Sequence, residues 1–451
     1  LSASGTKDAT TFLRGDDSFQ VVAVTPTAVS DQANTSTGAF DLPSGTTAQR
    51  PGSPSAGYTR FNTDLGVMEN YDGSAWLKVS SIVPVLASVT GTIYAGAAST
   101  LTLAGTGFLT ANLIVSFTPS GGSATTVTVT PSSDTAATVA VPSAVYGQSA
   151  GVVIGVKVTN SDGSSSATSN KTVIGVPSGG TITTSGSYRI HTFNSSSTFT
   201  VPSGLTLSNV EYLVIAGGGG GGANRGGGAG AGGYRCSVVG ENSGGGASAE
   251  NRQTISTGSH TVTVGAGGAA SGGGGADDGG QGSNSVFNGI TSSGGGLGRS
   301  DDETGTSGGS GSGGGGGGTF AGGSGTSGQG YAGGSGYGNS TYGNPGGGGG
   351  GASAVGVTSN GTFGFGGAGL ASSITGSSVT RASGGGGGSG NASSEAATTG
   401  GGGKGSDSGD GSTSNYATVN TGGGGGGGSN GGSSVAGGQG GSGIVVIRYA
   451  L

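Results

Sequence analysis

Hydrophobic and polar positions alternate along much of the chain, in short runs that end at glycine, serine, asparagine or aspartate. Residues 101–103, 127–129 and 156–158 each read apolar, polar, apolar, which is the two-residue period of a strand with one buried face. Residues 177–451 show no apolar stripe at the 3.6-residue spacing of an amphipathic helix. The pattern predicts an all-β protein with essentially no α-helix.

The first of three zones comprises residues 1–81, where the strand-like runs at 58–61 and 75–79 are short and separated by turn residues. Asp72-Gly73 lies between "VMENY" and "SAWLKV" and predicts a hairpin turn. Because these pieces are too short and too polar to form a core alone, we expect neighbouring chains to complete it.

The second zone, residues 82–176, repeats strand patterns about every 8–12 residues, with glycine, serine, asparagine and aspartate between them. This spacing predicts a β-sandwich of the immunoglobulin-like type. The zone lacks the Cys–Trp–Cys set of antibody domains.

The third zone, residues 177–451, contains long runs of consecutive glycine, and the whole chain has 115 glycines among 451 residues. Strand-like segments lie between the runs, notably 210–216 before the first run and 441–451 at the end of the chain. The runs are 217–222, 313–318, 346–351, 384–388, 400–403 and 422–428.

Four interpretations of the glycine runs compete. A flexible linker is the usual one for Gly/Ser-rich sequence. Collagen is excluded because the runs are contiguous and Pro345 is the only proline after Pro202. Phosphate-loop patterns arise by chance at this glycine frequency, and the nearest one has Gly405 where serine or threonine must follow Lys404.

The fourth interpretation is a bundle of extended polyglycine helices with three residues per turn, which hydrogen-bond to one another through their backbones. Glycine loses the most entropy on ordering, so such a bundle needs a scaffold that holds its register. We expect segments 210–216 and 441–451 to provide it by lying in the same sheet.

The net charge and the amino-acid composition argue against several classes of binding site and activity. The net charge is −6, which provides no basic surface for a nucleic acid, and no apolar run approaches the ~18 residues of a membrane span. The single cysteine, Cys236, can form neither an intrachain disulfide nor a zinc site alone. The two histidines, His191 and His260, favour strand-packing or turn roles, and we expect no cofactor, no metal and no enzymatic activity.

The zones resemble known modules. The segments "FLRGDDSFQ" and "TTAQRPGSPSAGYTRFNTDLGVMENYDGSAWLKV" resemble modules of tailed-bacteriophage tail fibres and other virion fibres. The segments "LAGTGF", "ATVAVPSA" and "VKVTNSDGSSS" are similar to IPT/TIG immunoglobulin-like domains, and "LVIAGGGGGG", "TVTVGAGG" and "GGSGIVVIRY" resemble glycine-rich domains of phage tail proteins. The resemblance implies a homotrimeric virion fibre whose C-terminal jelly-roll-like sheet carries polyglycine II layers.

We therefore expect an extracellular structural fibre protein, a tail fibre or adhesin, that contacts other virion proteins through residues 1–81. Residues 177–451 would bind a host surface glycan or outer-membrane receptor. The alternatives are a capsid head fibre or decoration protein without a specific receptor, a polysaccharide-degrading fibre, and a bacterial surface protein. Because the sequence begins at Leu1, we expect it to be a fragment or a processed product.

The loops between the glycine runs contain the candidate receptor contacts. Aromatic planes beside amide groups suit sugar faces and hydroxyls, although tyrosines that cap glycine layers or pack on a neighbouring subunit would show the same pattern. A polysaccharide-degrading enzyme would need a pair of carboxylates, and the densest acidic groups of the chain are 277–278 and 301–303. The candidates are Phe320, Tyr331, Tyr337, Asn339, Tyr342 and Asn344, together with Arg299, Asp301, Asp302 and Glu303.

Overall fold

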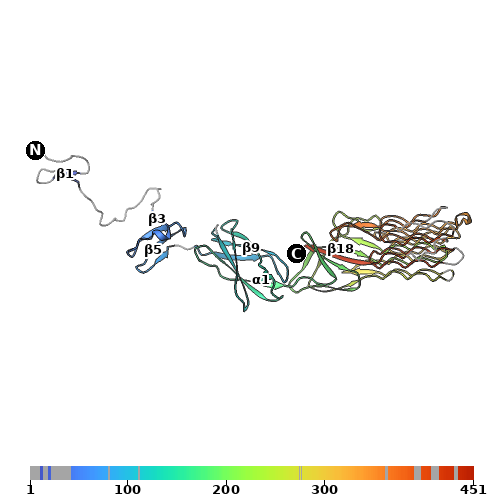
Figure 1. Ribbon diagram of the computed structural model, residues 1–451, viewed down its shortest axis with the longest axis horizontal. Helices are drawn as coiled ribbons and strands as arrows, with labels where there is room; N and C mark the ends of the chain where they lie inside the picture. Colours follow the sequence, from blue (N-terminus) through green and yellow to red (C-terminus); the bar gives the residue numbers. More distant parts are fainter. Residues whose placement is uncertain are drawn as a thin grey trace. The chain divides into compact units, whose positions relative to one another are not determined.

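A computed structural model describes residues 11–13, 19–21, 42–79, 82–109, 112–273, 275, 277–360, 364–390, 398–407, 416–430 and 435–450. Within these residues the structure is nearly all strand, loop and turn, and helix is confined to η1 (Thr47–Gln49), α1 (Ser143–Tyr146) and η2 (Ser340–Tyr342). The all-β prediction is therefore confirmed. The chain divides into two compact units, residues 1–82 and 83–451 (Figure 1).

The first unit contains a strand pair and a four-stranded sheet. β1 (Thr11–Leu13) pairs with β2 (Phe19–Val21), and the residues between them lie outside the described part of the chain. The sheet has the order β3 (Ser44–Gly45), β4 (Thr59–Asn62), β5 (Val67–Tyr71), β6 (Trp76–Lys78).

The predicted hairpin is confirmed, because β5 and β6 pair antiparallel across the turn at Asp72-Gly73. The Asp72 carboxylate accepts the backbone N–H groups of Ser74 and Ala75, each at 2.7 Å. Gly73 has φ +106°, a conformation that residues with a Cβ rarely adopt. This turn therefore follows directly from local sequence chemistry.

Residues 83–176 fold into two sheets over one apolar core. Alternate residues of β9 (Thr100–Thr106) and β13 (Val153–Thr159) are buried, such as Leu101, Leu103, Val156 and Val158, while the lysine between the last two faces outward. Buried side chains of both sheets belong to one cluster, so the predicted sandwich arrangement is observed. The first sheet has the strand order β11 (Thr125–Val129), β10 (Leu113–Pro119), β13 (Val153–Thr159), β14 (Ser169–Ile174), β8 (Ile93–Tyr94). The second sheet has the order β12 (Ala136–Ala140), β9 (Thr100–Thr106), β7 (Val85–Thr90).

The glycine-rich part also begins with two sheets around one core, to which Phe199, Tyr212, Phe287 and Tyr449 contribute. β18 (Leu207–Ile215) pairs antiparallel with β26 (Ile444–Ala450), so the prediction that the strands flanking the glycine runs share a sheet is confirmed. The first sheet has the strand order β15 (Thr181–Ser185), β16 (Tyr188–Phe193), β26, β18, β19 (Tyr234–Cys236), and β20 (Gln253–Ile255) also pairs with β18. The second sheet has the order β17 (Ser197–Val201), β21 (Gly258–Thr263), β22 (Ser285–Phe287), β23 (Ile290–Ser292). A separate pair is β24 (Leu370–Ser372) with β25 (Val379–Arg381).

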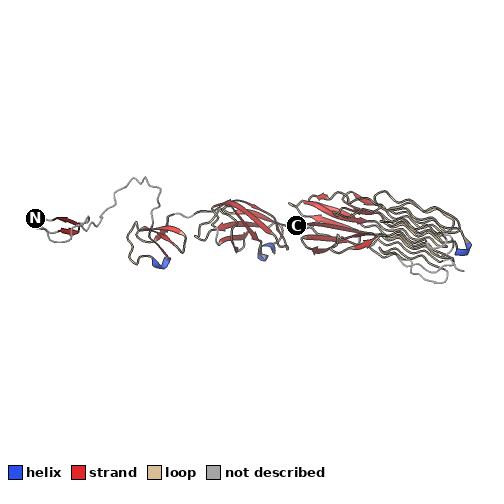
Figure 2. Ribbon diagram, turned by 90° about the horizontal axis from the view of Figure 1, so that it is seen from above, coloured by secondary structure: helices blue, strands red, loops and turns tan. Residues whose placement is uncertain are grey.

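Beyond the sheets, the glycine runs lie side by side as extended segments without strand pairing (Figure 2). The N–H groups of segment 217–222 donate in rotation to three neighbouring segments, at N···O distances of 2.8 to 3.3 Å. Residues 217 and 220 donate to segment 280–283, residues 218 and 221 to segment 438–441, and residues 219 and 222 to segment 227–230. A repeat of three residues is the period of a polyproline-II-like helix. The backbone N–H groups of this segment thus point outward in three directions.

The carbonyl groups of segment 217–222 accept hydrogen bonds from three further neighbours, 295–298, 425–428 and Gly268, at 2.7 to 2.9 Å. Six segments from the same chain therefore surround one fully buried glycine run. We call this packed array the glycine lattice. The linker interpretation is wrong for this run, because the run is buried and all six of its N–H groups and five of its six carbonyl groups are hydrogen-bonded.

The lattice has no room for side chains at its centre. An ideal Cβ on Gly220 would overlap the carbonyl oxygen of Ala269, and one on Gly221 would overlap that of Gly426. These approaches are closer than real Cβ contacts, so the neighbouring backbone would have to move. Close backbone packing, rather than conformational freedom, is the reason for glycine at these positions.

Candidate recognition surface at the tip of the glycine lattice

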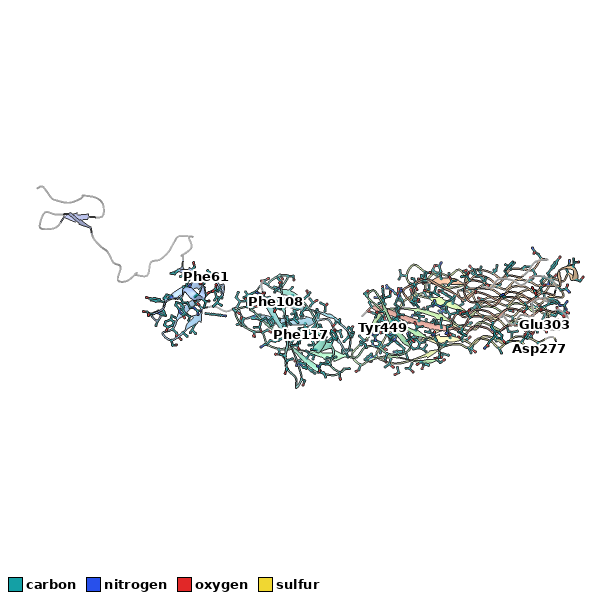
Figure 3. The ribbon with its side chains drawn as sticks, in the orientation of Figure 1. Phe61, Phe108, Phe117, Asp277, Glu303 and Tyr449 are labelled. Atoms are coloured by element: carbon teal, nitrogen blue, oxygen red, sulfur yellow. The ribbon has the colours of Figure 1, made fainter. Side chains whose placement is uncertain are left out.

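The turns of the lattice that carry most of the candidate side chains lie at the end away from the sheets. Asp277 and Glu303 lie at this end, whereas Tyr449 of β26 lies at the opposite end (Figure 3). We call this end the tip and define it by the turns 224–225, 277–278, 299–303, 316–320 and 337–344.

One side of the tip is charged. The Arg225 guanidinium is hydrogen-bonded to the carboxylate of Asp301. Arg299 Nη1 lies 2.5 Å from Asp278 Oδ2 and 3.1 Å from Glu303 Oε2. These contacts bring turns from three separate lattice segments together.

The Asp301 carboxylate is the most enclosed of these groups, with 9% of its side chain exposed. Burial raises the pKa of Asp301 and the Arg225 guanidinium opposes that rise. One carboxylate oxygen, Oδ1, and the Arg225 Nε have no hydrogen-bond partner among the described residues. The charged side is therefore held by pairing across turns and retains unused polar atoms.

The other side of the tip carries aromatic and amide groups. Gly336 N donates to Phe320 O at 2.9 Å, and Tyr337 N donates to Pro345 O at 3.0 Å. These bonds place the Phe320 turn beside the loop that contains η2, and the side chains of Phe320 and Tyr337 are half-buried.

Two amide residues set the shape of this loop. Asn339 caps η2 by accepting the backbone N–H of Thr341 on its Oδ1 at 3.0 Å. Asn344 N donates to Asn339 O at 3.1 Å, and Asn344 adopts a left-handed φ of +50°. The side chain of Tyr342, the last residue of η2, is outside what the structure describes.

The two sides meet at Gly316. Its N–H donates to Arg225 O at 2.9 Å, and its carbonyl accepts Asp302 N at 3.0 Å. An ideal Cβ on Gly316 would overlap Asn344 O. The charged turns and the aromatic loop are therefore adjacent, which brings Arg299, Asp301, Asp302, Glu303, Phe320, Tyr337, Asn339 and Asn344 to one end.

Tyr331 does not belong to this group. Its hydroxyl lies beside Gly246, in the segment between β19 and β20, where an ideal Cβ would be 2.8 Å away. Six residues of extended backbone separate Tyr331 from Tyr337, about 19 Å at the ~3.1 Å rise per residue of such helices. Tyr331 thus lies nearer the sheets than the tip.

The sequence reasoning did not include Arg225 or Asp278 among the candidate contacts. Asn224-Arg225 interrupts two glycine-rich segments, and both residues have positive φ, +53° and +60°. A polar pair between glycine runs is therefore the signal of a lattice turn, and it would have identified Arg225.

The histidines lie away from the tip, on the sheets. His191 is fully buried, with Nδ1 2.7 Å from Gly179 O and Nε2 2.9 Å from the Tyr449 hydroxyl. Burial lowers the pKa of His191 to about 4. His260 Nε2 lies 2.9 Å from Ser256 O. The geometry gives both rings backbone or packing partners.

Cys236 of β19 is also buried, and burial raises the pKa of its thiol to about 12. Across the described ranges, no group of three or more His, Cys, Asp or Glu side chains is arranged to hold a metal ion. The described part of the chain also contains no helix long and apolar enough to cross a membrane.

Comparison with known proteins identifies one family. The family model of the glycine-rich domain matches residues 191–450, more than half of the chain. No curated protein and no solved structure matches the sequence. The matched range begins within β16 and ends with β26, so it includes the β18–β26 pair and the lattice segments that lie between these two strands in the sequence.

Proposed function

The chain belongs to the glycine-rich domain family, and on that premise we propose that it is a structural fibre protein of a tailed-phage virion that binds the host cell surface through the lattice tip. It acts as a tail fibre or adhesin, without catalysis. It assembles as a homotrimer and contacts other virion proteins through its N-terminal segment.

The observation that carries this proposal is the convergence of chemically diverse turns at one end of a rigid backbone lattice. Recognition residues are characteristically placed on loops that a rigid scaffold positions. In the lattice the scaffold is the hydrogen-bonded backbone itself, so turn side chains that make no contact with another turn can differ without disturbing the packing that holds them.

The chemistry of the tip supports a glycan as the ligand. Phe320 and Tyr337 offer aromatic surface of the kind that packs on the apolar faces of sugar rings, and Asn344 adds amide groups to hydrogen-bond hydroxyls. The charged side contains five carboxylates, at residues 277, 278 and 301–303, against the guanidinium groups of Arg225 and Arg299. This excess of negative charge disfavours a polyanionic ligand and favours a neutral or amino-bearing glycan.

Binding to susceptible cells tests the proposal. Tyr337→Ala is expected to weaken binding of the purified protein about tenfold, since an aromatic contact contributes about 1–1.5 kcal/mol. Tyr188→Ala is the matched control, because Tyr188 is 39% exposed on β16 at the sheet end. The proposal fails if the wild type neither binds susceptible cells nor blocks phage adsorption, or if both variants bind equally.

Antibody labelling of intact virions tests the location separately. Label at the tail supports the adhesin, whereas label confined to the capsid would establish the head-fibre alternative. A reducing-sugar assay on host capsule addresses the degrading-fibre alternative, and we expect no release of sugar.

A further inference from the structure

Two carboxylates of the tip converge on one point beside Gly317. An ideal Cβ on Gly317 would overlap the Oδ1 atoms of both Asp301 and Asp302. Gly317 belongs to the turn 316–320 and has φ +85°, whereas the two aspartates belong to the turn 299–303. The two oxygens therefore share a position that is open only because residue 317 has no side chain.

Backbone contacts hold the two carboxylates in place. Asp302 N donates to Gly316 O at 3.0 Å, which fixes the turn 299–303 against the turn 316–320. Asp302 has a left-handed φ of +62°, and in this conformation the side chains of two consecutive residues reach the same point. The convergence is therefore a product of the fold and not of free side-chain rotation.

One of the converging oxygens is buried and has no partner. The Asp301 side chain is 9% exposed, and its Oδ2 accepts a hydrogen bond from Arg225 Nη2. Its Oδ1 is buried and makes no hydrogen bond to any residue that the structure describes. A carboxylate oxygen removed from water in this way costs free energy unless positive charge or a donor compensates it. Burial raises the pKa of Asp301, the Arg225 guanidinium opposes that rise, and the Asp302 carboxylate adds to it.

The arginines of the tip leave the second carboxylate unpaired. Arg225 is paired with Asp301, and Arg299 is paired with two other acidic residues. Within the described ranges, no residue forms a hydrogen bond or an ion pair with the Asp302 side chain. Two negative charges that face each other at one point repel, and a cation between them relieves both the repulsion and the cost of the buried oxygen.

We propose that Asp301 Oδ1 and Asp302 Oδ1 are ligands of a Ca²⁺ ion at the tip. Calcium binds oxygen ligands at about 2.3–2.6 Å, so one ion spans two oxygens that each lie within about 2.5 Å of one point, as these two do. Because the described residues contain no group of three or more acidic, His or Cys side chains, backbone carbonyls and water complete the coordination. Mg²⁺ is disfavoured, since it demands a near-octahedral set of ligands and gives up its water reluctantly.

The ion neutralises the facing carboxylates of the turn 299–303 against Gly317, so it stabilises the charged side of the tip. The sequence alone led to the expectation of no metal, because consecutive acidic residues in a glycine-rich turn are usually solvated. Only the fold places their oxygens at one point beside a glycine of another turn. Ion binding by the purified chain does not depend on host binding, so either proposal stands or fails without the other.

Titration calorimetry of the full chain with CaCl₂, at about 0.15 M NaCl to screen diffuse charge, tests the site. The wild type is expected to bind one ion per chain with a Kd of about 0.1–1 mM, the range of weak extracellular sites. Asp302→Asn should bind roughly tenfold more weakly, and asparagine tolerates the left-handed φ of this position. Asp277→Asn is the matched control, since it removes the same charge from another turn of the tip, and its Kd should stay within about twofold of the wild type (Figure 3). A wild type without saturable binding, or equal affinities of the two variants, would overturn the proposal.

A pair of glycine variants separates a built site from diffuse negative charge. Gly317→Ala keeps every charge of the tip but puts a methyl group where the two oxygens converge, and it is expected to lose the calcium binding. Gly240→Ala is the matched control, because Gly240 has nearly the same φ, +84°, and no atom lies within 4 Å of its added Cβ. Urea denaturation without calcium measures the backbone strain that the two alanines share. A folded Gly317→Ala protein that binds calcium as tightly as Gly240→Ala would refute the site, and Asp302→Asn covers the case in which Gly317→Ala does not fold.

Discussion

Substitution of one lattice glycine gives the sharpest test of the backbone packing. Gly220 N donates to Gly280 O at 2.8 Å, and Gly220 O accepts Gly298 N at 2.8 Å. A methyl group at position 220 would overlap Ala269 O, so at least one neighbouring segment must move away. Gly220→Ala is therefore expected to strain the lattice and to weaken both of these hydrogen bonds.

The magnitude follows from three contributions. Overpacking a close-packed interior costs about 1–3 kcal/mol. Two weakened backbone hydrogen bonds add about 1 kcal/mol each. The lower entropy of alanine in the unfolded chain offsets about 0.4–1 kcal/mol. The expected net loss of stability is about 3 kcal/mol, which corresponds to about a 150-fold rise in the population of opened lattice.

Cys236 provides the assay, because it is the only cysteine and is buried in β19 beside the lattice. When opening and closing are fast, its labelling by a thiol reagent reports the opened population. Gly52→Ala is the control, since no atom lies within 4 Å of the added Cβ, and its labelling rate should match the wild type. A Gly220→Ala rate within twofold of the wild type would refute the packing argument.

Two further predictions concern buried charge. Burial depresses the folded-state pKa of His191 from its ordinary value of 6.5 to about 4. The contribution of the neutral, buried His191 to the free energy of unfolding is therefore complete above pH 6.5, and it is lost as the pH falls from 6.5 towards 4. This loss should amount to about 3 kcal/mol in urea denaturation, and His191→Gln should lack it; an unchanged pH profile would contradict the assignment. Arg225→Met leaves the enclosed Asp301 carboxylate without its partner and should cost about 2 kcal/mol in the same measurement. The double variant with Asp301→Asn should recover most of that loss, and a double variant as unstable as Arg225→Met would show that the ion pair is not responsible.

Local sequence chemistry determined the strands and their tight turns. The alternation at residues 101–103 and 156–158 predicts the buried faces of β9 and β13, because side chains of a strand point alternately to its two faces. Asp72-Gly73 predicts the β5–β6 hairpin through a carboxylate acceptor and a positive φ. The glycine runs themselves indicated backbone-to-backbone packing, since only segments without side chains approach so closely.

Tertiary structure alone decided which glycine segments are neighbours. Consecutive glycines are chemically identical, so no side chain along run 217–222 specifies that its partners are 280–283, 438–441 and 227–230. That register comes from the flanking strands, whose apolar side chains pair β18 with β26 in one core.

Tertiary structure also decides which candidate residues reach the tip. Tyr331 and Tyr337 are alike in sequence context, yet the length of one extended segment places Tyr331 near the sheets and Tyr337 at the tip. The pairing of Arg225 with Asp301 joins residues 76 positions apart. Such contacts depend on the order in which identical backbones are packed, and that order is set by the sheets at the far end of the lattice.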